Sequence, residues 1–158
     1  MSGTVTIILT HDRDTRVQRL TAVHETFCAA HTPTGSGHAL SAEKPDRADE
    51  QGPVFWLALQ DDRPVGCIGL RTLSEGRAEL KTLHVLEEAR GGGIAAQLLQ
   101  HCVAAARADG VQHLLLETGR SDGFAASQRF YARHGFAACE PYGPYVGDPF
   151  SYCMARLL

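Results

Sequence analysis

The sequence predicts one domain of the α/β (α+β) class, in which helices flank a mixed, mostly antiparallel sheet of about seven strands. Residues 79–118 read as a strand, a glycine-rich turn, a helix and a second strand, and such a crossover joins parallel strands with a right-handed connection. Residues 54–60, 64–73 and 79–85 alternate with short polar turns, as strands of an antiparallel meander do. The 158 residues are 44% hydrophobic, which is enough for one sizeable core over residues 1–158.

The N-terminal region predicts a strand and a helix. Residues 4–9 are largely β-branched and apolar, and Asp12 or Asp14 can cap the helix that follows. Helical spacing then places five residues on one face: Val17, Leu20, Val23, His24 and Phe27. Residues 31–53 are rich in proline and glycine, so we expect them to be either partly helical around residues 39–44 or a mobile flap.

The middle of the chain predicts the meander. Residues 54–60 and 64–73 form two strands around a polar hairpin turn at residues 61–63. Gly66 and Gly69 lie inside the second of them, where glycine indicates a bulge or a close approach of two backbones.

The second half predicts the remaining elements. Ile94, Leu98, Cys102 and Ala105 recur at helical spacing, and Gly110 supplies the left-handed residue that commonly follows a helix. Four further elements follow the strand around residues 114–118: a helix at 124–134 ended by Gly135, a strand at 136–140, a turn-rich loop at 141–149, and a seventh strand at 151–158 that closes the sheet.

The turn between the strand and the helix reads Arg90-Gly91-Gly92-Gly93. The first N–H groups of a helix have no partner within the helix and carry partial positive charge. Three glycines leave these donors unshielded, and Arg90 adds a full positive charge. The pattern favours a phosphate or pyrophosphate site over a turn that only lets the helix and strand pack closely.

Three phosphate-binding motifs can be compared with this turn. A P-loop needs Gly-Lys-Ser/Thr, whereas an isoleucine and an alanine follow Gly93. A dinucleotide fingerprint can be fitted to Gly91, Gly93 and Ala96, but five residues separate it from the preceding strand. The third pattern, Arg/Gln-x-x-Gly-x-Gly/Ala, is matched by Arg90, Gly93 and Ala95. It is the acetyl-coenzyme A pyrophosphate motif of the GNAT superfamily of N-acetyltransferases.

Four segments in order resemble that superfamily. ELKTLHV (79–85) is similar to its fourth strand, GGGIAAQLLQHCVAAARADG (91–110) to its cofactor-binding helix, LLLETG (114–119) to its fifth strand and FYARHGF (130–136) to a recurrent segment. The first half of the chain is compatible but less distinctive. Gly92 departs from the pattern, because many members carry Lys or another basic residue there.

The resemblance implies the GNAT acyl-CoA N-acyltransferase fold with acetyl-CoA as cosubstrate. Backbone N–H groups around Leu83, His84 and Val85 would contact the thioester carbonyl and the pantetheine arm. A splay between strands four and five would leave these groups without a ladder partner. The turn and the start of the helix would hold the pyrophosphate through Arg90, Gly91, Gly92, Gly93, Ala95 and Ala96.

The resemblance also suggests two catalytic residues. Tyr131 matches the tyrosine proposed in the family as general acid to the coenzyme A sulfur, and its alternative role is that of a core residue. The phenol and the thiol have pKa values in a similar range, which suits this transfer. Glu79 matches a glutamate that serves some members as general base, often through water. Its alternative role is that of a solvated carboxylate at the start of a strand.

Other polar residues are candidates for the acceptor site. Glu117, at the end of strand five, can hold the charge of an amine or make a structural hydrogen bond. Tyr142 and Tyr145 can close the acceptor pocket or pack at an interface. His84 falls on the opposite face of the strand from Glu79 if the strand is regular, although a bulge would change that. Its side chain either packs in the core or takes part in a chain of water molecules.

Composition excludes several function classes. A net charge of −3 without a basic run gives no attraction to nucleic acid, and no apolar stretch reaches transmembrane length. The five cysteines include no C-x-x-C pair, which predicts reduced, mostly buried thiols in a cytoplasmic protein. No metal site is expected, because no histidine pair stands at ligand spacing. A homodimer is compatible with the sequence.

The sequence thus predicts an acetyl-CoA-dependent N-acetyltransferase that acts on a primary amine of a small molecule or peptide. A non-catalytic acyl-CoA-binding or sensing module on the same fold is the alternative. A nicotinamide-dependent oxidoreductase built on the G-x-G-x-x-A pattern ranks third.

Overall fold

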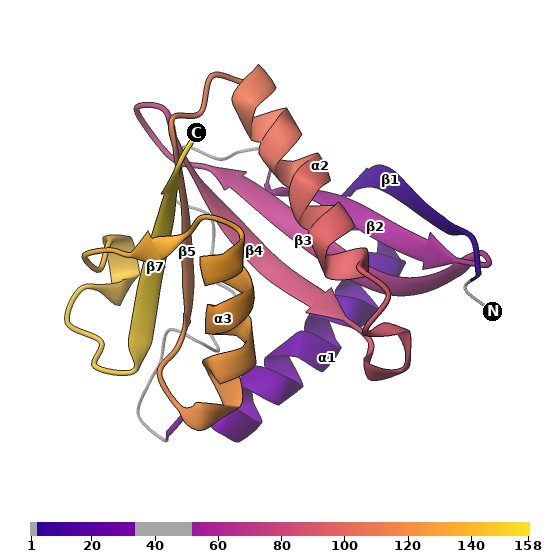
Figure 1. The fold of residues 1–158 in the computed structure, drawn as a ribbon, viewed down its shortest axis with the longest axis horizontal. Coiled ribbons are helices and arrows are strands. Elements are labelled where there is room, and N and C mark those ends of the chain that lie inside the picture. The colour runs from indigo at the N-terminus through magenta and orange to yellow at the C-terminus, as the bar shows by residue number, and fades with distance from the viewer. Residues whose placement is uncertain (1–2, 34–51) are drawn as a thin grey trace.

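A mixed sheet of seven strands, ordered β1-β2-β3-β4-β5-β7-β6, runs through the computed structural model, which describes residues 3–33 and 52–158. The strands are β1 (Val5–His11), β2 (Val54–Gln60), β3 (Arg63–Thr72), β4 (Arg77–Val85), β5 (His113–Gly119), β6 (Ala137–Ala138) and β7 (Ser151–Leu157). The helices are α1 (Thr15–His31), α2 (Ile94–Ala108) and α3 (Ala125–Arg133), with short 3₁₀ turns η1 (Glu87–Ala89), η2 (Asp122–Phe124) and η3 (Gly143–Tyr145) (Figure 1). The partial helix expected around residues 39–44 lies outside the described residues, as does most of the 31–53 segment, for which a mobile flap is the alternative expectation.

The strand order confirms the meander and the crossover. β1 to β4 pair as antiparallel neighbours, and β4 pairs with β5 in parallel. The strand expected at 136–140 is reduced to the two residues of β6, because only Ala137 and Ala138 come into register with β7 before the chain turns away. β7 lies between β5 and β6, so the last strand of the sequence is not the last strand of the sheet.

A bulge changes the faces of β4. Cys67 pairs with His84 and Gly69 pairs with Lys81, so β4 contains one residue more than β3 between these pairs. Thr82 takes up the irregularity with a φ of 43°. Regular alternation would put His84 on the opposite face from Glu79, but the extra residue puts both on the same face.

The bulge expected in β3 lies beside Gly69, and the close backbone approach lies at Gly66. A Cβ at Gly69 would come within 2.8 Å of the Phe55 ring. Gly66 is similar, since its Cβ would meet the carbonyl oxygen of His84 at 3.0 Å. Larger residues would therefore push neighbouring strands apart here.

β4 and β5 separate soon after they begin. Only Arg77, Ala78 and Glu79 pair with β5, and the last pair joins Glu79 to Leu115. Among the described residues the rest of β4, up to Val85, has no ladder partner on the β5 side. This is the splay that the family resemblance implies.

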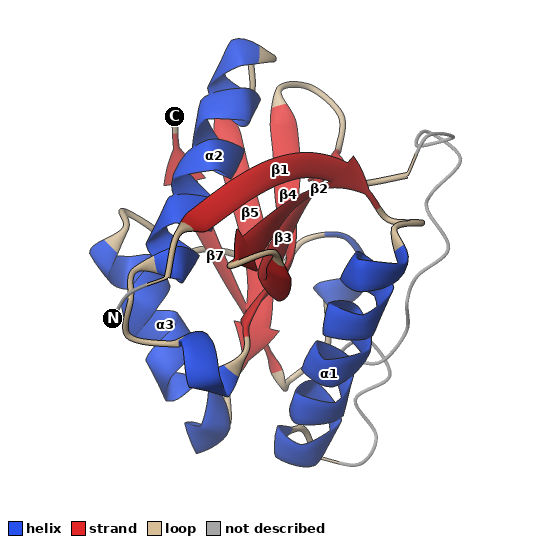
Figure 2. Cartoon of the chain, turned by 90° about the vertical axis from the view of Figure 1, so that its right-hand side faces the viewer, coloured by secondary structure: helices blue, strands red, loops and turns tan. Residues whose placement is uncertain are grey.

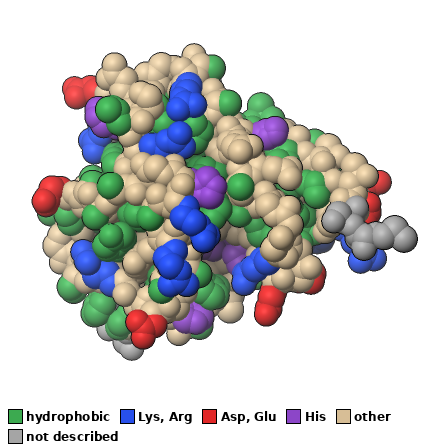
Figure 3. Space-filling view, in the orientation of Figure 1, with side chains coloured by type: hydrophobic (Ala, Val, Ile, Leu, Met, Phe, Trp, Pro, Cys, Tyr) green, Lys and Arg blue, Asp and Glu red, His purple; other side chains and the backbone are tan. Residues whose placement is uncertain are grey.

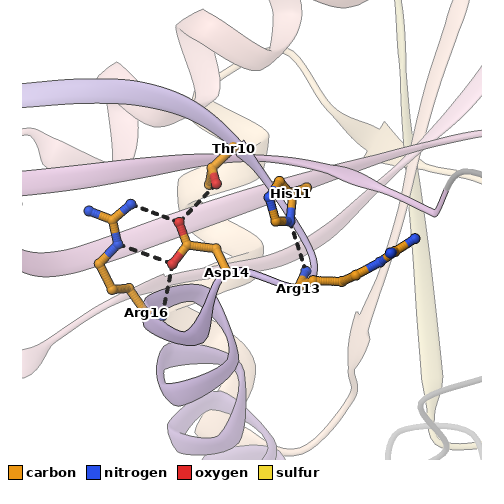
Figure 4. A network of polar contacts seen from close by, with 5 residues as sticks. All are labelled: Thr10, His11, Arg13, Asp14 and Arg16. Atoms are coloured by element: carbon orange, nitrogen blue, oxygen red, sulfur yellow. Dashed lines mark hydrogen bonds and ion pairs between the residues drawn. The ribbon is translucent and has the colours of Figure 1, made fainter.

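Helix α1 covers one face of the sheet. Asp14 is its N-cap, and the carboxylate accepts a bond from the backbone N–H of Arg16 at 2.9 Å (Figure 4). The Arg16 guanidinium and the Thr10 hydroxyl also bond to this carboxylate, and the pKa of Asp14 is lowered mainly by the bond from Arg16. Val17 and Leu20 are buried against β2 and β3, but Val23 is 46% exposed and does not belong to the core.

Helix α2 covers the other face (Figure 2). Its apolar stripe packs on the sheet through Ile94, Leu98, Leu99, Cys102, Val103 and Ala106. Gly110 follows the helix with a φ of 79°, as the sequence predicts. In the part of the chain that the structure describes, no helix has the length and apolarity needed to cross a membrane.

Candidate active site

A cavity of about 520 Å³ lies where β4 and β5 separate. Its walls come from α1, β3, β4, β5, the η2–α3 region and the loop before β7. In the orientation of Figure 1, the surface is hollowed between α3 and the start of α2, and Lys and Arg side chains surround the hollow (Figure 3). The splay therefore produces an opening with polar walls in the middle of the sheet.

The glycine turn lies at the start of α2, after the end of β4 and the short turn η1. Gly93 is the N-cap with a φ of 80°, and no side chain caps the helix. Cβ atoms at Gly91, Gly92 or Gly93 would meet nothing within 4 Å, so the space over the helix N-terminus is open. Ala95 and Ala96 are half-buried in the first turn. The first N–H groups of α2 are thus exposed to an anion.

Arg90 connects this turn to the end of β4. Its Nε donates to the carbonyl oxygen of Val85 at 2.9 Å, which fixes the side chain beside the turn. The residue is exposed, so its guanidinium lies at the rim, as the sequence predicts.

The three β4 residues expected to contact the cosubstrate differ in position. Leu83 is half-buried and lines the cavity. Val85 is buried in the α2-side core, and His84 is buried on the α1 side. All three lie in the part of β4 that has left β5, so their backbones lie along the opening.

Tyr131 lies between the two faces of the sheet. It belongs to the core beneath α2, yet it also lines the cavity whose other wall is α1. Burial, followed by the proximity of Cys102 and Cys28, raises the pKa of the Tyr131 phenol, which therefore stays protonated at neutral pH.

Glu79 is 4% exposed and held in a polar cluster, which corrects its alternative role as a solvated carboxylate. Lys81 Nζ lies 2.8 Å from one carboxylate oxygen, and the Tyr142 hydroxyl donates to the other at 2.6 Å. Lys81 also donates to the Tyr145 hydroxyl at 3.3 Å. Lys81 and Tyr145 line the cavity, and Glu79 and Tyr142 form a supporting layer behind them.

Glu117 lines the cavity from the β5 side. Burial raises the pKa of its carboxyl to about 7, against smaller lowering effects of a Ser151 hydrogen bond and the Lys81 charge. A carboxylate with such a pKa can accept a proton near neutral pH. The sequence assigned Glu117 to substrate binding, and its environment also suits proton transfer.

His24 and His84 form a pair in the site, and sequence reasoning did not predict this contact. The Nδ1 atoms of His24 and His84 lie 3.2 Å apart, and His24 Nε2 lies 3.4 Å from Cys28 Sγ. Burial, and then the His84 charge, lowers the pKa of His24 to about 4, so this ring is neutral. The contact depends on the β4 bulge, which turns His84 toward α1.

The structure therefore brings Tyr131, Glu117, Leu83 and Tyr145 to one cavity, with Glu79 and Tyr142 behind it. The glycine turn lies at the start of α2, and its residues are not among those that line the cavity. Sequence reasoning missed Lys81 and His24, although Lys81 could have been found from the i, i+2 spacing that puts it on the same face as Glu79.

Comparison with known proteins gives the same assignment. The family model "Acetyltransferase (GNAT) family" matches residues 20–136. The uncharacterized N-acetyltransferase YedL of Escherichia coli (strain K12) is 33% identical over 142 residues, covering 90% of this chain and 87% of YedL.

Solved structures agree on the fold. A Klebsiella pneumoniae protein assigned to the acyl-CoA N-acyltransferases has a TM-score of 0.80 at 25% identity over 98% of both chains. N-acetylglutamate synthase from Neisseria gonorrhoeae, complexed with coenzyme A and N-acetyl-glutamate, has a TM-score of 0.71 at 20% identity over 100% of this chain and 36% of that chain. The chain described here belongs to the acetyltransferase (GNAT) family and is an N-acetyltransferase.

Proposed function

We propose that the protein transfers the acetyl group of acetyl-CoA to a primary amine of a small molecule or peptide, inside the opening between β4 and β5. The observation that carries this proposal is the early separation of β4 from β5, which leaves the edge of β4 around residues 83–85 unpaired on the β5 side, beside a cavity lined by Leu83, Glu117 and Tyr131. The N-terminus of α2, which no side chain caps, follows the end of β4 through the short turn η1.

The donor half of the opening suits coenzyme A. The open space over Gly91, Gly92 and Gly93 leaves room for a pyrophosphate against the first N–H groups of α2. The free edge of β4 around residues 83–85 offers backbone groups to the pantetheine arm and the thioester carbonyl, whose oxygen gains charge during transfer.

Glu117 and Tyr131 can supply the two proton transfers. The amine nitrogen attacks the thioester carbonyl carbon, a C–N bond forms and the C–S bond breaks. Glu117 accepts the proton that the nitrogen loses, directly or through water, and Tyr131 donates its proton to the departing sulfur. The raised pKa of Glu117 makes it a stronger base than an ordinary carboxylate. The raised pKa of Tyr131 keeps its phenol protonated until the thiolate departs, and it also makes the phenol a weaker acid than a free tyrosine.

Glu79 is the second candidate for the base. Its two oxygens are engaged by Lys81 and Tyr142, so in this arrangement its main task is to fix these two side chains. We therefore assign proton transfer to Glu117 and positioning to Glu79.

Release of free thiol from acetyl-CoA, measured with a panel of amino acids, polyamines, aminoglycosides and peptide N-termini, tests the function. We expect thiol release with at least one amine, together with a product heavier by one acetyl group. Binding of acetyl-CoA without thiol release for any amine would refute catalysis.

A further inference from the structure

The two strands that form the opening carry opposite charges at matching positions. The last β4–β5 pair is Glu79 with Leu115, so Lys81 and Glu117 each lie two residues beyond it. Alternation along both strands gives them the same face, and both line the cavity. Lys81 is also close enough to lower the pKa of Glu117. A cation and a carboxylate therefore face each other across the opening.

Lys81 is held in place with donor capacity to spare. An ammonium group has three N–H donors. The contacts it makes with the described residues direct one to Glu79 at 2.8 Å and one to the Tyr145 hydroxyl at 3.3 Å. Its side chain is 30% exposed, so the third donor can reach a ligand in the cavity. Arg71, which pairs with Glu79 across the β3–β4 ladder, adds a second positive charge to the same wall.

Acidic and basic side chains both line the cavity. Lys81 and Arg71 belong to the β3–β4 side, whereas Glu117 lines the cavity from β5, Asp12 is half-buried after β1 and Glu25 is exposed on α1. The two cations that can bind a carboxylate therefore lie on the β3–β4 side of the cavity.

The cavity wall also contains a group of aromatic side chains. Aromatic rings of Phe27, Phe55, Phe124 and Phe150 line the cavity, and Phe27 and Phe124 meet edge to face with centroids 5.9 Å apart. A cavity of about 520 Å³ holds an acceptor with a bulky side chain beside the acetyl donor.

We propose that the acceptor is an α-amino acid with an apolar or aromatic side chain, whose carboxylate binds Lys81 and whose amine faces Glu117. The inference rests on the proposed function and narrows its substrate. One zwitterion satisfies both charged walls at once, because its carboxylate and amine are attached to the same carbon.

The test compares acceptors that differ only at the carboxylate: L-phenylalanine, L-phenylalaninamide and phenethylamine, each followed by thiol release. We expect kcat/KM for L-phenylalanine to exceed that for the other two by about 10- to 100-fold, the range of one hydrogen bond to a charged group. The α-amine of L-phenylalaninamide is less basic than that of L-phenylalanine and offers more free amine at neutral pH, so amine basicity works against the expected order for this pair. The amine of phenethylamine is more basic, so the comparison with the amide is the decisive one.

Variants locate the effect. Lys81→Gln should reduce the kcat/KM preference for L-phenylalanine over the amide and phenethylamine to about one, because a loss that acts through Glu79 or Glu117 is shared by all three acceptors and cancels in this ratio. Lys81→Arg should restore much of the preference, and Arg63→Gln, on the exposed β2–β3 hairpin, should change nothing. Lys81→Gln could fail to fold because it leaves the buried Glu79 without its partner. The double variant Glu79→Gln/Lys81→Gln removes both charges, and the same comparison of acceptors is then made on it.

Each outcome decides one of the two proposals. Equal rates for the acid and the amide, or an equal loss for all three acceptors in Lys81→Gln, would overturn the amino-acid assignment. Turnover of a polyamine or an aminoglycoside, but not of L-phenylalanine, would do the same and leave N-acetylation standing. Absence of thiol release for every amine would refute the proposed function and this inference with it.

Discussion

At the scale of single residues, the site separates two carboxylates by environment. Glu79 is paired with Lys81 and Tyr142. Glu117 is removed from water, and the Ser151 hydrogen bond and the Lys81 charge offset this burial only in part, so its pKa rises to about 7. A paired carboxylate is a poor proton acceptor, because protonation would break the pair. This difference leads to a test that separates their roles.

We predict that Glu117→Gln removes the ionisation near pH 7 from the pH–rate profile. In the parent enzyme kcat/KM should fall as the pH drops through about 7, because protonated Glu117 cannot accept a proton. Loss of this base should lower the rate by about 10²–10⁴-fold. Glu79→Gln should lower the rate less and retain the ionisation near pH 7. The reverse pattern would assign the base to Glu79.

For Tyr131 we predict a loss of turnover without a loss of folding. Tyr131→Phe keeps the ring that packs beneath α2 and removes only the hydroxyl. Loss of a general acid typically costs about 10²–10⁴-fold, and it should fall on kcat rather than on acetyl-CoA binding. The measurement is a single-turnover rate beside a calorimetric affinity. Unaltered turnover in the folded variant would make Tyr131 a core residue only.

The raised pKa of Glu117 also predicts how stability depends on pH. Between the ordinary value of 4.5 and about 7, the unfolded chain has lost this proton and the folded protein keeps it. The folded state then binds more protons, so the free energy of unfolding should decrease as the pH rises through this window, by up to about 3 kcal/mol. Urea unfolding at several pH values checks this. Glu117→Gln should remove most of the pH dependence of the unfolding free energy, and the control Glu88→Gln should retain it. An equal slope in the parent protein and both variants would contradict the raised pKa of Glu117.

At the scale of elements, the start of α2 can be tested without straining the backbone. Gly93 has a φ of 80°, so any side chain there is strained, whereas Gly92 is exposed, has no positive φ, and has open space around it. We predict that Gly92→Glu weakens acetyl-CoA binding about tenfold or more, since a negative charge would face the pyrophosphate.

Gly92→Lys is the matched control for this element. It adds a side chain of similar length with the opposite charge, so the affinity should stay the same or increase, and added salt should reduce the difference between the two variants. Calorimetry on both variants makes the comparison. Equal weakening by both would mean that the turn only packs, and that the pyrophosphate binds elsewhere.

The elements themselves could be predicted from local patterns. The hairpin at Asp61 and Asp62, both with positive φ, the stop of α2 at Gly110 and the cap at Asp14 or Asp12 depend on neighbours in sequence, and the structure confirms them. The bulge at Thr82 could not be placed in this way, because it arises from the register between β3 and β4. It decides which face His84 occupies, and with it the contact between His84 and His24.

At the scale of the whole molecule, what the sequence could not show is long-range pairing. The insertion of β7 between β5 and β6 and the early separation of β4 from β5 depend on residues far apart in the chain. The same holds for the cluster of Glu79, Lys81, Tyr142 and Tyr145, which joins β4 to the loop before β7. Tyr131 was identified through the family resemblance, and Glu117 through its place at the end of a strand. The structure places both residues on one cavity.

If acetyl-CoA occupies the opening between β4 and β5, it must cover the backbone N–H groups that border this opening, and hydrogen exchange of backbone amides measures that. Exchange slows where a ligand covers or bonds an N–H group. Saturating acetyl-CoA should slow exchange at residues 83–85 and 91–96, and leave β1 at the far edge of the sheet unchanged. Slowing that is confined to other segments while acetyl-CoA is bound would contradict the account.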